Sequence, residues 1–204
     1  MTFYKNRSKF SGLSEGIGRS FSRLGLSPKQ WTLVSLMPVL IAVYALSERM
    51  FIIAGLLFIL SSFLDMVDGA VARQTGKATR KGAYLDTIVD RYVEVIIVFG
   101  VLLASLPGFI FQASAWIFLY LFGSLMTTYS KAAAKEKELI GRGDELKGGL
   151  LERAERLIIL FVGIMLASLD PVLLTYVIAL LAVLTNISAL QRISMAMKKK
   201  QGLF

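Results

Sequence analysis

The sequence contains no cysteine and no histidine among its 204 residues. The absence of cysteine excludes disulfide bonds and thiolate metal sites. The absence of histidine removes the commonest general base of enzymes and the commonest ligand of transition metals. Any bound metal ion must therefore be held by oxygen atoms, which favours Mg²⁺, Mn²⁺ or Ca²⁺.

Long apolar runs dominate the chain. Hydrophobic residues make up 55% of it and the mean hydropathy is +0.65, which is more apolar than an ordinary soluble domain. We predict an all-α integral membrane protein with six transmembrane helices. The apolar segments that predict these helices are 30–47, 51–72, 83–104, 109–131, 156–169 and 171–191. The fifth is short, and it reaches the length of a span only if it begins near Leu150.

The region before the first apolar segment is predicted to form an amphipathic helix at the membrane surface. Residues 8–26 place apolar side chains at helical spacing, with serine, arginine and glutamate on the other face. The apolar residues are Phe10, Leu13, Ile17, Phe21 and Leu24. Ser27 and Pro28 fit the N-cap and first position of the next helix. We divide the chain into this tail and juxtamembrane helix (1–29), a six-helix catalytic domain (30–195) and a basic tail (196–204).

The distribution of basic residues predicts the orientation in the membrane. Of the 23 lysine and arginine residues, only Arg49 lies on the side that carries the three tight turns. Both termini and the long basic connections lie on the other side, which the positive-inside rule places in the cytoplasm of a cell-membrane protein. The net charge of +9 favours anionic lipid headgroups and phosphorylated substrates as partners, and not nucleic acid.

Four aspartates occupy helical spacings at the cytoplasmic ends of the second and third apolar segments. Asp65 and Asp68 are three residues apart, and Asp86 and Asp90 are four apart, so each pair lies on one stripe of a helix. A short connection makes the two helices antiparallel neighbours, and the carboxylates can then converge. Charges inside apolar helices are costly, and four carboxylates repel one another. The sequence therefore predicts a metal site in a polar cavity open to the cytoplasm.

These aspartates also fit two other kinds of membrane protein. A cation transporter would carry carboxylates in its spans, but it would normally place them near the middle of the bilayer. A catalytically silent lipid-binding relative is a second alternative. Glu94 extends the stripe of Asp86 and Asp90 by one further turn, and it fits either a supporting partner of the site or an ion pair with Arg91.

The motif of these residues resembles the signature of the CDP-alcohol phosphotransferase family, D-x2-D-G-x2-A-R-x8-G-x3-D-x3-D. Every fixed position of that signature is matched here, by Asp65, Asp68, Gly69, Ala72, Arg73, Gly82, Asp86 and Asp90. The resemblance implies an enzyme of phospholipid synthesis with six spans, usually a homodimer. It implies that an acceptor hydroxyl attacks the phosphorus of a CDP-linked lipid and that CMP leaves.

The same resemblance implies roles for individual residues. It makes Asp65, Asp68 and Asp86 ligands of two divalent ions, Mg²⁺ or Mn²⁺, and Asp90 the general base, with Asp90 also touching a metal. The CDP moiety would be held by Asp65, Asp68, Gly69, Arg73 and Gly82, while Ala72 serves packing.

The acceptor is less clearly indicated. The run from Gly149 to Arg156 is similar to a segment of synthases that use inositol phosphate and related polyol phosphates. Lys131, Arg153 and Arg192 resemble their phosphate-binding positions, although basic residues are also expected there from topology alone. We predict a phosphorylated acceptor, with inositol phosphate ahead of glycerol phosphate; inositol and serine are alternatives.

Overall fold

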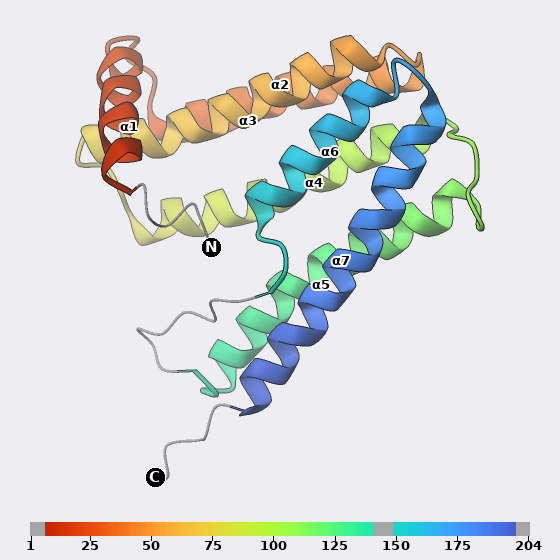
Figure 1. Ribbon diagram of the computed structural model, residues 1–204. Helices are drawn as coiled ribbons and strands as arrows, with labels where there is room; N and C mark the ends of the chain where they lie inside the picture. Colours follow the sequence, from red (N-terminus) through yellow and green to blue (C-terminus); the bar gives the residue numbers. More distant parts are fainter. Residues whose placement is uncertain (1–6, 141–148, 199–204) are drawn as a thin grey trace. The chain divides into compact units, whose positions relative to one another are not determined.

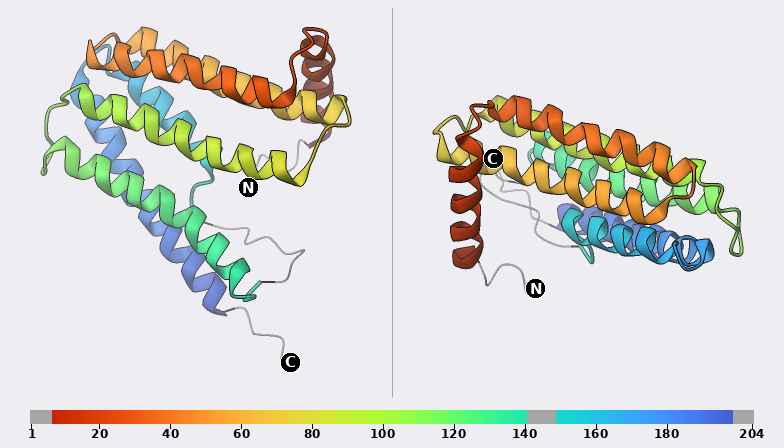
Figure 2. Two further views of the ribbon diagram at one scale, coloured as in Figure 1. Left: turned by 180° about the vertical axis from the view of Figure 1, so that it is seen from behind. Right: turned by 90° about the horizontal axis from the view of Figure 1, so that it is seen from above.

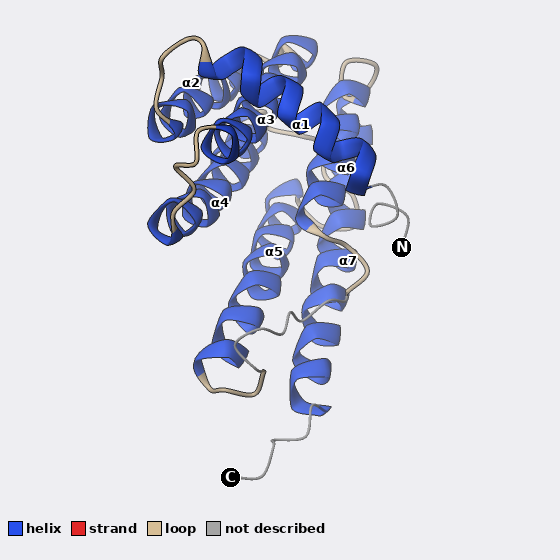
Figure 3. Cartoon of the chain, turned by 90° about the vertical axis from the view of Figure 1, so that its left-hand side faces the viewer, coloured by secondary structure: helices blue, strands red, loops and turns tan. Residues whose placement is uncertain are grey.

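The computed structural model describes residues 7–140 and 149–198 and is helical throughout (Figure 1). Figure 3 shows helices joined by loops, with no strand in the part of the chain that is described. An isolated bridge between Phe109 and Phe111 is the one β-type contact among these residues. The all-α prediction is confirmed.

The helices belong to two compact units. The first unit comprises residues 1–46 and 53–100, and the second comprises residues 47–52 and 101–204. The helices of the first are α1 (Arg7–Ser22), α2 (Pro28–Ser47), α3 (Phe51–Gln74) and α4 (Arg80–Leu103), with the ends of the last three reaching into the second. The helices of the second are α5 (Ala113–Glu136), α6 (Arg153–Leu166) and α7 (Pro171–Lys198).

A helix forms in the predicted region, and it packs on α2 and α3 within the first unit. It ends at Ser22, four residues before the predicted end, and the backbone turns at Gly25 with a φ of +73°. The ring of Phe21 meets Trp31 edge-on with centroids 5.3 Å apart. Phe21 and Ile17 both pack on a cluster of buried side chains that Trp31 forms with Val67 and Val71. Figure 2 shows α1 lying across one end of α2 and α3. The side chains of Phe10 and Leu13 lie outside the described residues.

A close backbone contact joins α1 to α3. A Cβ atom added to Gly18 would lie 2.7 Å from the carbonyl oxygen of Ala70 and 3.1 Å from Cβ of Gln74. Real Cβ atoms do not come so near a backbone oxygen, so glycine is required for this spacing of the helices. The contact matters for function because Ala70 follows Asp68 and Gly69 directly.

The start of α2 is capped as the sequence predicts. The backbone N–H of Ser27 donates to Oε1 of Gln30 at 2.8 Å, and the backbone N–H of Gln30 approaches Oγ of Ser27 at 3.4 Å. This reciprocal pair is a capping box, and Pro28 occupies the first helical position, where no N–H is needed.

In the second unit, α5 runs along α7 and α6 packs on α7 (Figure 1). A close approach occurs at Gly123 of α5, where an added Cβ would lie 2.9 Å from the backbone nitrogen of Asn186 on α7. The side chain of Asn186 crosses this contact and donates to the carbonyl oxygen of Leu119 at 2.9 Å. Buried hydroxyl groups follow the same helices: Ser124, Thr127 and Ser130 on α5, and Thr185 and Ser188 on α7.

Three of the described helices are long and apolar enough to cross a membrane. They contain the spans Gln30–Ser47, Phe51–Gln74 and Pro171–Lys198. Many large apolar side chains of these helices are exposed, such as Met37 at 67% and Leu190 at 66%, as expected for surfaces that face lipid. Each of the six predicted segments lies largely within a helix. The number of these helices that cross the membrane stays a prediction.

The fifth predicted segment is the shortest helix of the second unit. Helix α6 begins at Arg153 and has 14 residues, which is a length of about 21 Å. A hydrocarbon core is about 30 Å thick. At the other extreme, α7 continues to Lys198, which carries the helix into the predicted basic tail. Residues 199–204 of that tail, like residues 1–6, lie outside the described part.

We predict that Gly18→Ala destabilises the protein by about 1–3 kcal/mol, because the new methyl group must displace α1 from α3. Gly16→Ala is the matched control in the same helix: an added Cβ there meets nothing within 4 Å, and alanine raises helix propensity by up to about 1 kcal/mol. Thermal unfolding of the detergent-solubilised variants, followed by circular dichroism, measures both. Equal melting temperatures for the two variants would contradict the close contact.

Candidate functional site

The end of α3 and the start of α4 bring three of the predicted carboxylates together. One oxygen atom from each of Asp65, Asp68 and Asp86 lies within 4.8 Å of the others. Both pairs of aspartates are set on their helices by spacings of three and four residues, and residues 75–79 form the short link that returns the chain. The sequence predicted that four carboxylates can converge, and the geometry brings together three of them, without Asp90.

The geometry of this group fits a divalent cation. Two oxygen atoms that share one ion at 2.1–2.6 Å lie at most about 5 Å apart. Like charges this close repel one another, and a cation between them relieves the repulsion. The ligands are all carboxylate oxygens, the set that Mg²⁺ and Mn²⁺ accept. Asp65, Asp68 and Asp86 could therefore hold such an ion together.

Thr32 supports this site, although no motif in the sequence pointed to it. Its hydroxyl donates to Oδ2 of Asp68 at 2.5 Å, and both side chains are buried. The two residues are 36 positions apart and lie on different helices. The bond restrains the orientation of the Asp68 carboxylate, which lies beside Asp65 and Asp86. The one signal in the sequence was the position of Thr32 in the first turns of α2, close to Pro28.

Asp90 lies one turn beyond Asp86 on α4 and is not a member of the group of three. The residue after it, Arg91, forms an ion pair with Glu94 at 2.9 Å, and the side chain of Glu94 is buried. Of the two roles considered for Glu94, the structure therefore shows the ion pair with Arg91. The role of Asp90 as a base or metal ligand stays a prediction.

A cavity of about 530 Å³ adjoins the carboxylates within the first unit. Of the residues predicted to bind CDP, it is lined by Asp68, Gly69, Arg73 and Gly82, together with Asp86. Gly69 makes room for a neighbour, because an added Cβ would lie 3.3 Å from the guanidinium of Arg73. The cavity thus combines carboxylates at one part of its wall with a guanidinium at another.

Further lining residues were not predicted. The ammonium-bearing side chains of Lys77 and Lys81 line the same cavity, as does Thr79, whose hydroxyl accepts the backbone N–H of Gly82 at 3.0 Å. The three cations, Arg73 included, give the cavity the charge that a diphosphate needs. In the sequence, Lys77 and Lys81 fall in the basic connection between two apolar segments, where basic residues are expected from topology alone.

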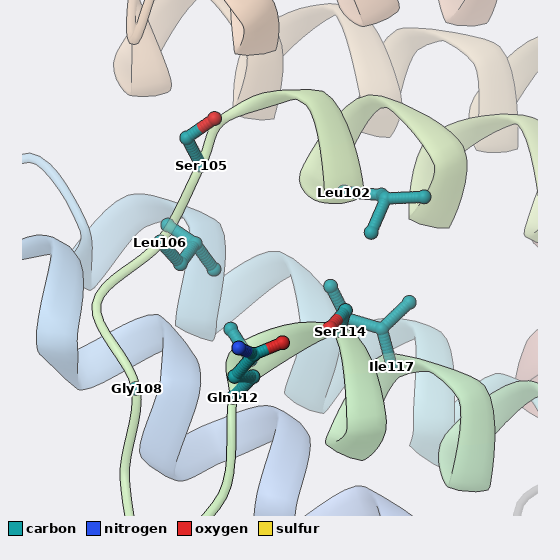
Figure 4. Close-up of a pocket in the computed structure, with 8 residues that line it drawn as sticks. Leu102, Ser105, Leu106, Gly108, Gln112, Ser114 and Ile117 are labelled. Atoms are coloured by element: carbon teal, nitrogen blue, oxygen red, sulfur yellow. The ribbon is translucent and has the colours of Figure 1, made fainter.

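A second cavity, of about 270 Å³, lies at the connection between α4 and α5 (Figure 4). Ser105, Gln112 and Ser114 supply its polar groups, and Leu102, Leu106 and Ile117 its apolar walls. None of its lining residues, all in the described part of the chain, carries a charge. It has none of the carboxylates and cationic groups that line the first cavity, so the chemistry is assigned to the first cavity.

The three residues predicted to bind an acceptor phosphate all belong to the second unit. Lys131 is half-buried on α5, and Arg153 is half-buried as the first residue of α6. Arg192 on α7 is 5% exposed. Its Nη1 donates to the carbonyl oxygen of Thr127 at 2.9 Å, and its Nη2 lies 3.3 Å from Oε2 of Glu152.

Arg156 is a buried cation that was not singled out as a site residue. It is 1% exposed and donates to Oγ of Ser124 at 3.2 Å and to Oγ1 of Thr127 at 3.4 Å. Thr127 therefore accepts from two guanidinium groups, through its hydroxyl from Arg156 and through its carbonyl from Arg192. The sequence could not separate Arg156 from Arg153, because both stand in one turn of α6.

Comparison with known proteins identifies relatives of the whole chain. The family model described as CDP-alcohol phosphatidyltransferase matches residues 26–188. The archaetidylinositol phosphate synthase of Pyrococcus horikoshii is 35% identical over 197 residues, with 96% of each chain covered.

Two solved structures of phosphatidylinositol phosphate synthase from Mycobacterium tuberculosis are also similar. The structure with CDP-DAG bound has a TM-score of 0.79 at 26% identity and covers 94% of this chain and 96% of that one. The complex with manganese and citrate has a TM-score of 0.80 at 27% identity, with 94% and 92% covered.

We predict that Thr32→Val weakens Mn²⁺ binding by about 10-fold, because residues that orient metal ligands typically contribute that much to affinity. Thr87→Val is the matched control, since the hydroxyl of Thr87 bonds only within its own helix in the contacts described, to the carbonyl of Ala83. Titration with Mn²⁺, with the free ion measured by electron paramagnetic resonance, gives the affinities. Equal affinities for wild type and Thr32→Val would refute the supporting role.

Proposed function

The chain belongs to the CDP-alcohol phosphatidyltransferase family, and we propose that its acceptor alcohol is a phosphorylated polyol, inositol phosphate ahead of glycerol phosphate. It is a metal-dependent transferase of phospholipid synthesis. It transfers the substituted phosphate group of a CDP-linked lipid to the hydroxyl of an acceptor and releases CMP.

One observation carries the placement of this chemistry: three carboxylate oxygens converge within 4.8 Å beside a cavity with cationic walls. In our proposal, Asp65, Asp68 and Asp86 hold the divalent ions. When bound, the metal neutralises the diphosphate and polarises the phosphorus under attack. Arg73 and the backbone at Gly69 and Gly82 hold the CDP moiety against these carboxylates.

Asp90 is the proposed general base. It follows Asp86 by one helical turn, so its carboxylate is carried by the same stripe of α4 as a metal ligand. It would take the proton of the acceptor hydroxyl while that oxygen forms its bond to phosphorus. The bond from phosphorus to the CMP oxygen breaks at the same centre, and CMP leaves with the electron pair. Positioning and charge stabilisation supply most of the rate in such transfers.

The acceptor phosphate is assigned to Lys131, Arg153 and Arg192. The support is strongest for Arg192, a buried guanidinium whose direction is set by the carbonyl oxygen of Thr127. A planar guanidinium in a fixed orientation can bind two oxygens of a phosphate at once. The relative from Pyrococcus horikoshii and the two solved neighbours are all named as inositol phosphate lipid synthases, which supports inositol phosphate as the first candidate.

The proposed membrane arrangement has six spans, with both termini and the first cavity at the cytoplasmic side, in a homodimer. The charge distribution supports the orientation, because Arg49 is the one basic residue on the opposite side. Its guanidinium has a structural task there. It donates to the carbonyl oxygens of Ala104 at 3.2 Å and Ser105 at 2.9 Å, just after the end of α4. Cations at a helix C-terminus are favourable, so Arg49 does not weaken the rule.

We expect CMP release from a CDP-lipid to require both a divalent metal and inositol 1-phosphate, and to fall by at least about 100-fold in Asp90→Asn, because a general base contributes about that much or more. The assay compares inositol 1-phosphate, glycerol phosphate, inositol and serine as acceptors. Asp170→Asn, on the far side of the membrane, is the matched control. Release with free inositol or serine alone would contradict the phosphorylated acceptor.

Arg192→Gln should raise the KM for inositol 1-phosphate by about 10- to 100-fold, because a charge-assisted hydrogen bond contributes about 1.5–3 kcal/mol. The KM for the CDP-lipid should change little. Lys198→Gln, at the exposed end of the same helix, controls for loss of positive charge. Parallel kinetics in detergent micelles measure both constants. An unchanged acceptor KM in Arg192→Gln would remove this residue from the proposed phosphate site.

A further inference from the structure

The chain covers Arg192 with the segment that leads into α6. The backbone N–H of Leu151 donates to Oγ of Ser188 on α7 at 3.1 Å, which ties this segment to the helix that carries Arg192. Gly149 has a φ of +116°, and an added Cβ there would lie 3.2 Å from Nε of Arg192. The backbone at Gly149 thus lies close to the guanidinium of Arg192.

Glu152, the last residue before α6, supplies a carboxylate beside Arg192. Glu152 is the N-cap residue of α6, and its backbone N–H donates to Oε2 of Glu155 at 2.9 Å. Its own Oε2 lies 3.3 Å from Nη2 of Arg192. The two side chains differ sharply in exposure: the side chain of Glu152 is 62% exposed, whereas that of Arg192 is 6% exposed.

We propose that Glu152 is an exchangeable counter-ion of Arg192 and that it makes the site selective for phosphorylated acceptors. The inference rests on the phosphorylated acceptor proposed above. Without acceptor, the carboxylate of Glu152 accompanies the guanidinium. When the acceptor binds, its phosphate takes the place of that carboxylate, and Glu152 moves into solvent.

The difference in exposure decides which partner can leave. A buried guanidinium recovers little water when it loses an anion, so Arg192 stays in place and favours an anionic neighbour. A largely exposed carboxylate recovers its hydration as it moves away, and such half-exposed pairs are weak. A phosphate with about two negative charges and three acceptor oxygens competes well against one carboxylate.

The same difference in charge gives the selectivity. A neutral hydroxyl group of inositol or glycerol cannot compensate the charge of Arg192, so it does not displace Glu152. The carboxylate then remains beside the guanidinium and also repels any weakly held anion. Arg153 and Glu155 follow Glu152 in the first turn of α6, but in the contacts described the carboxylate that meets Arg192 is that of Glu152.

The experiment is a comparison of Glu152→Gln with wild type. Glutamine keeps the size of the side chain but removes the charge that competes with phosphate. The KM for inositol 1-phosphate should fall by about two- to fivefold, which is the range expected for loss of a half-exposed pair. The inhibition constant of inorganic phosphate should fall equally, and the KM for the CDP-lipid should not change. Glu136→Gln, 71% exposed on α5, is the matched control.

A purely structural role for Glu152 would give the opposite result. If the carboxylate only positions Arg192, Glu152→Gln raises the acceptor KM, and this outcome or an unchanged KM overturns the proposal. Glu152→Asp provides a second variant that favours the N-cap while shortening the reach to Arg192. Like Glu152→Gln, Glu152→Asp should lower the acceptor KM. Failure of the wild type to use any phosphorylated acceptor would instead overturn the proposed function.

Discussion

Three carboxylate oxygens meet where α3 and α4 come together, and their mutual repulsion has to be offset by a cation for this end of the first unit to keep its shape. The surrounding contacts serve that arrangement. Thr32 fixes the carboxylate of Asp68 from α2, and α1 braces the adjoining turn of α3 through the backbone contact at Gly18. The candidate metal site is therefore coupled to the packing of all four helices of this unit.

The second unit buries side chains of the opposite charge. Arg156 and Arg192 are both buried, and burial of a guanidinium is unfavourable unless its hydrogen bonds are made. Hydroxyl and carbonyl oxygens of α5 accept bonds from both, with Thr127 shared between them. Such a network keeps a buried cation oriented, which is what recognition of a phosphate requires. The first unit thus groups carboxylate oxygens, and the second buries two guanidinium groups.

Family membership decides between the functions that the aspartates alone allow. The same carboxylates in apolar helices would suit a cation transporter, and their spacing does not exclude it. The match of the family model to residues 26–188 and the similarity to a synthase over nearly the whole chain support the transferase and not the transporter.

The sequence by itself determined the helices and the convergence of Asp65, Asp68 and Asp86. Apolar runs set the helices, and a fixed period of 3.6 residues with a short link puts those side chains on facing stripes. Contacts between distant segments were decided only by the tertiary structure. The bond from Thr32 to Asp68 and the pairing of Glu152 with Arg192 join residues 36 and 40 positions apart. The burial of Arg156 was likewise hidden, because the period of a helix says which residues share a face but not which neighbour covers it.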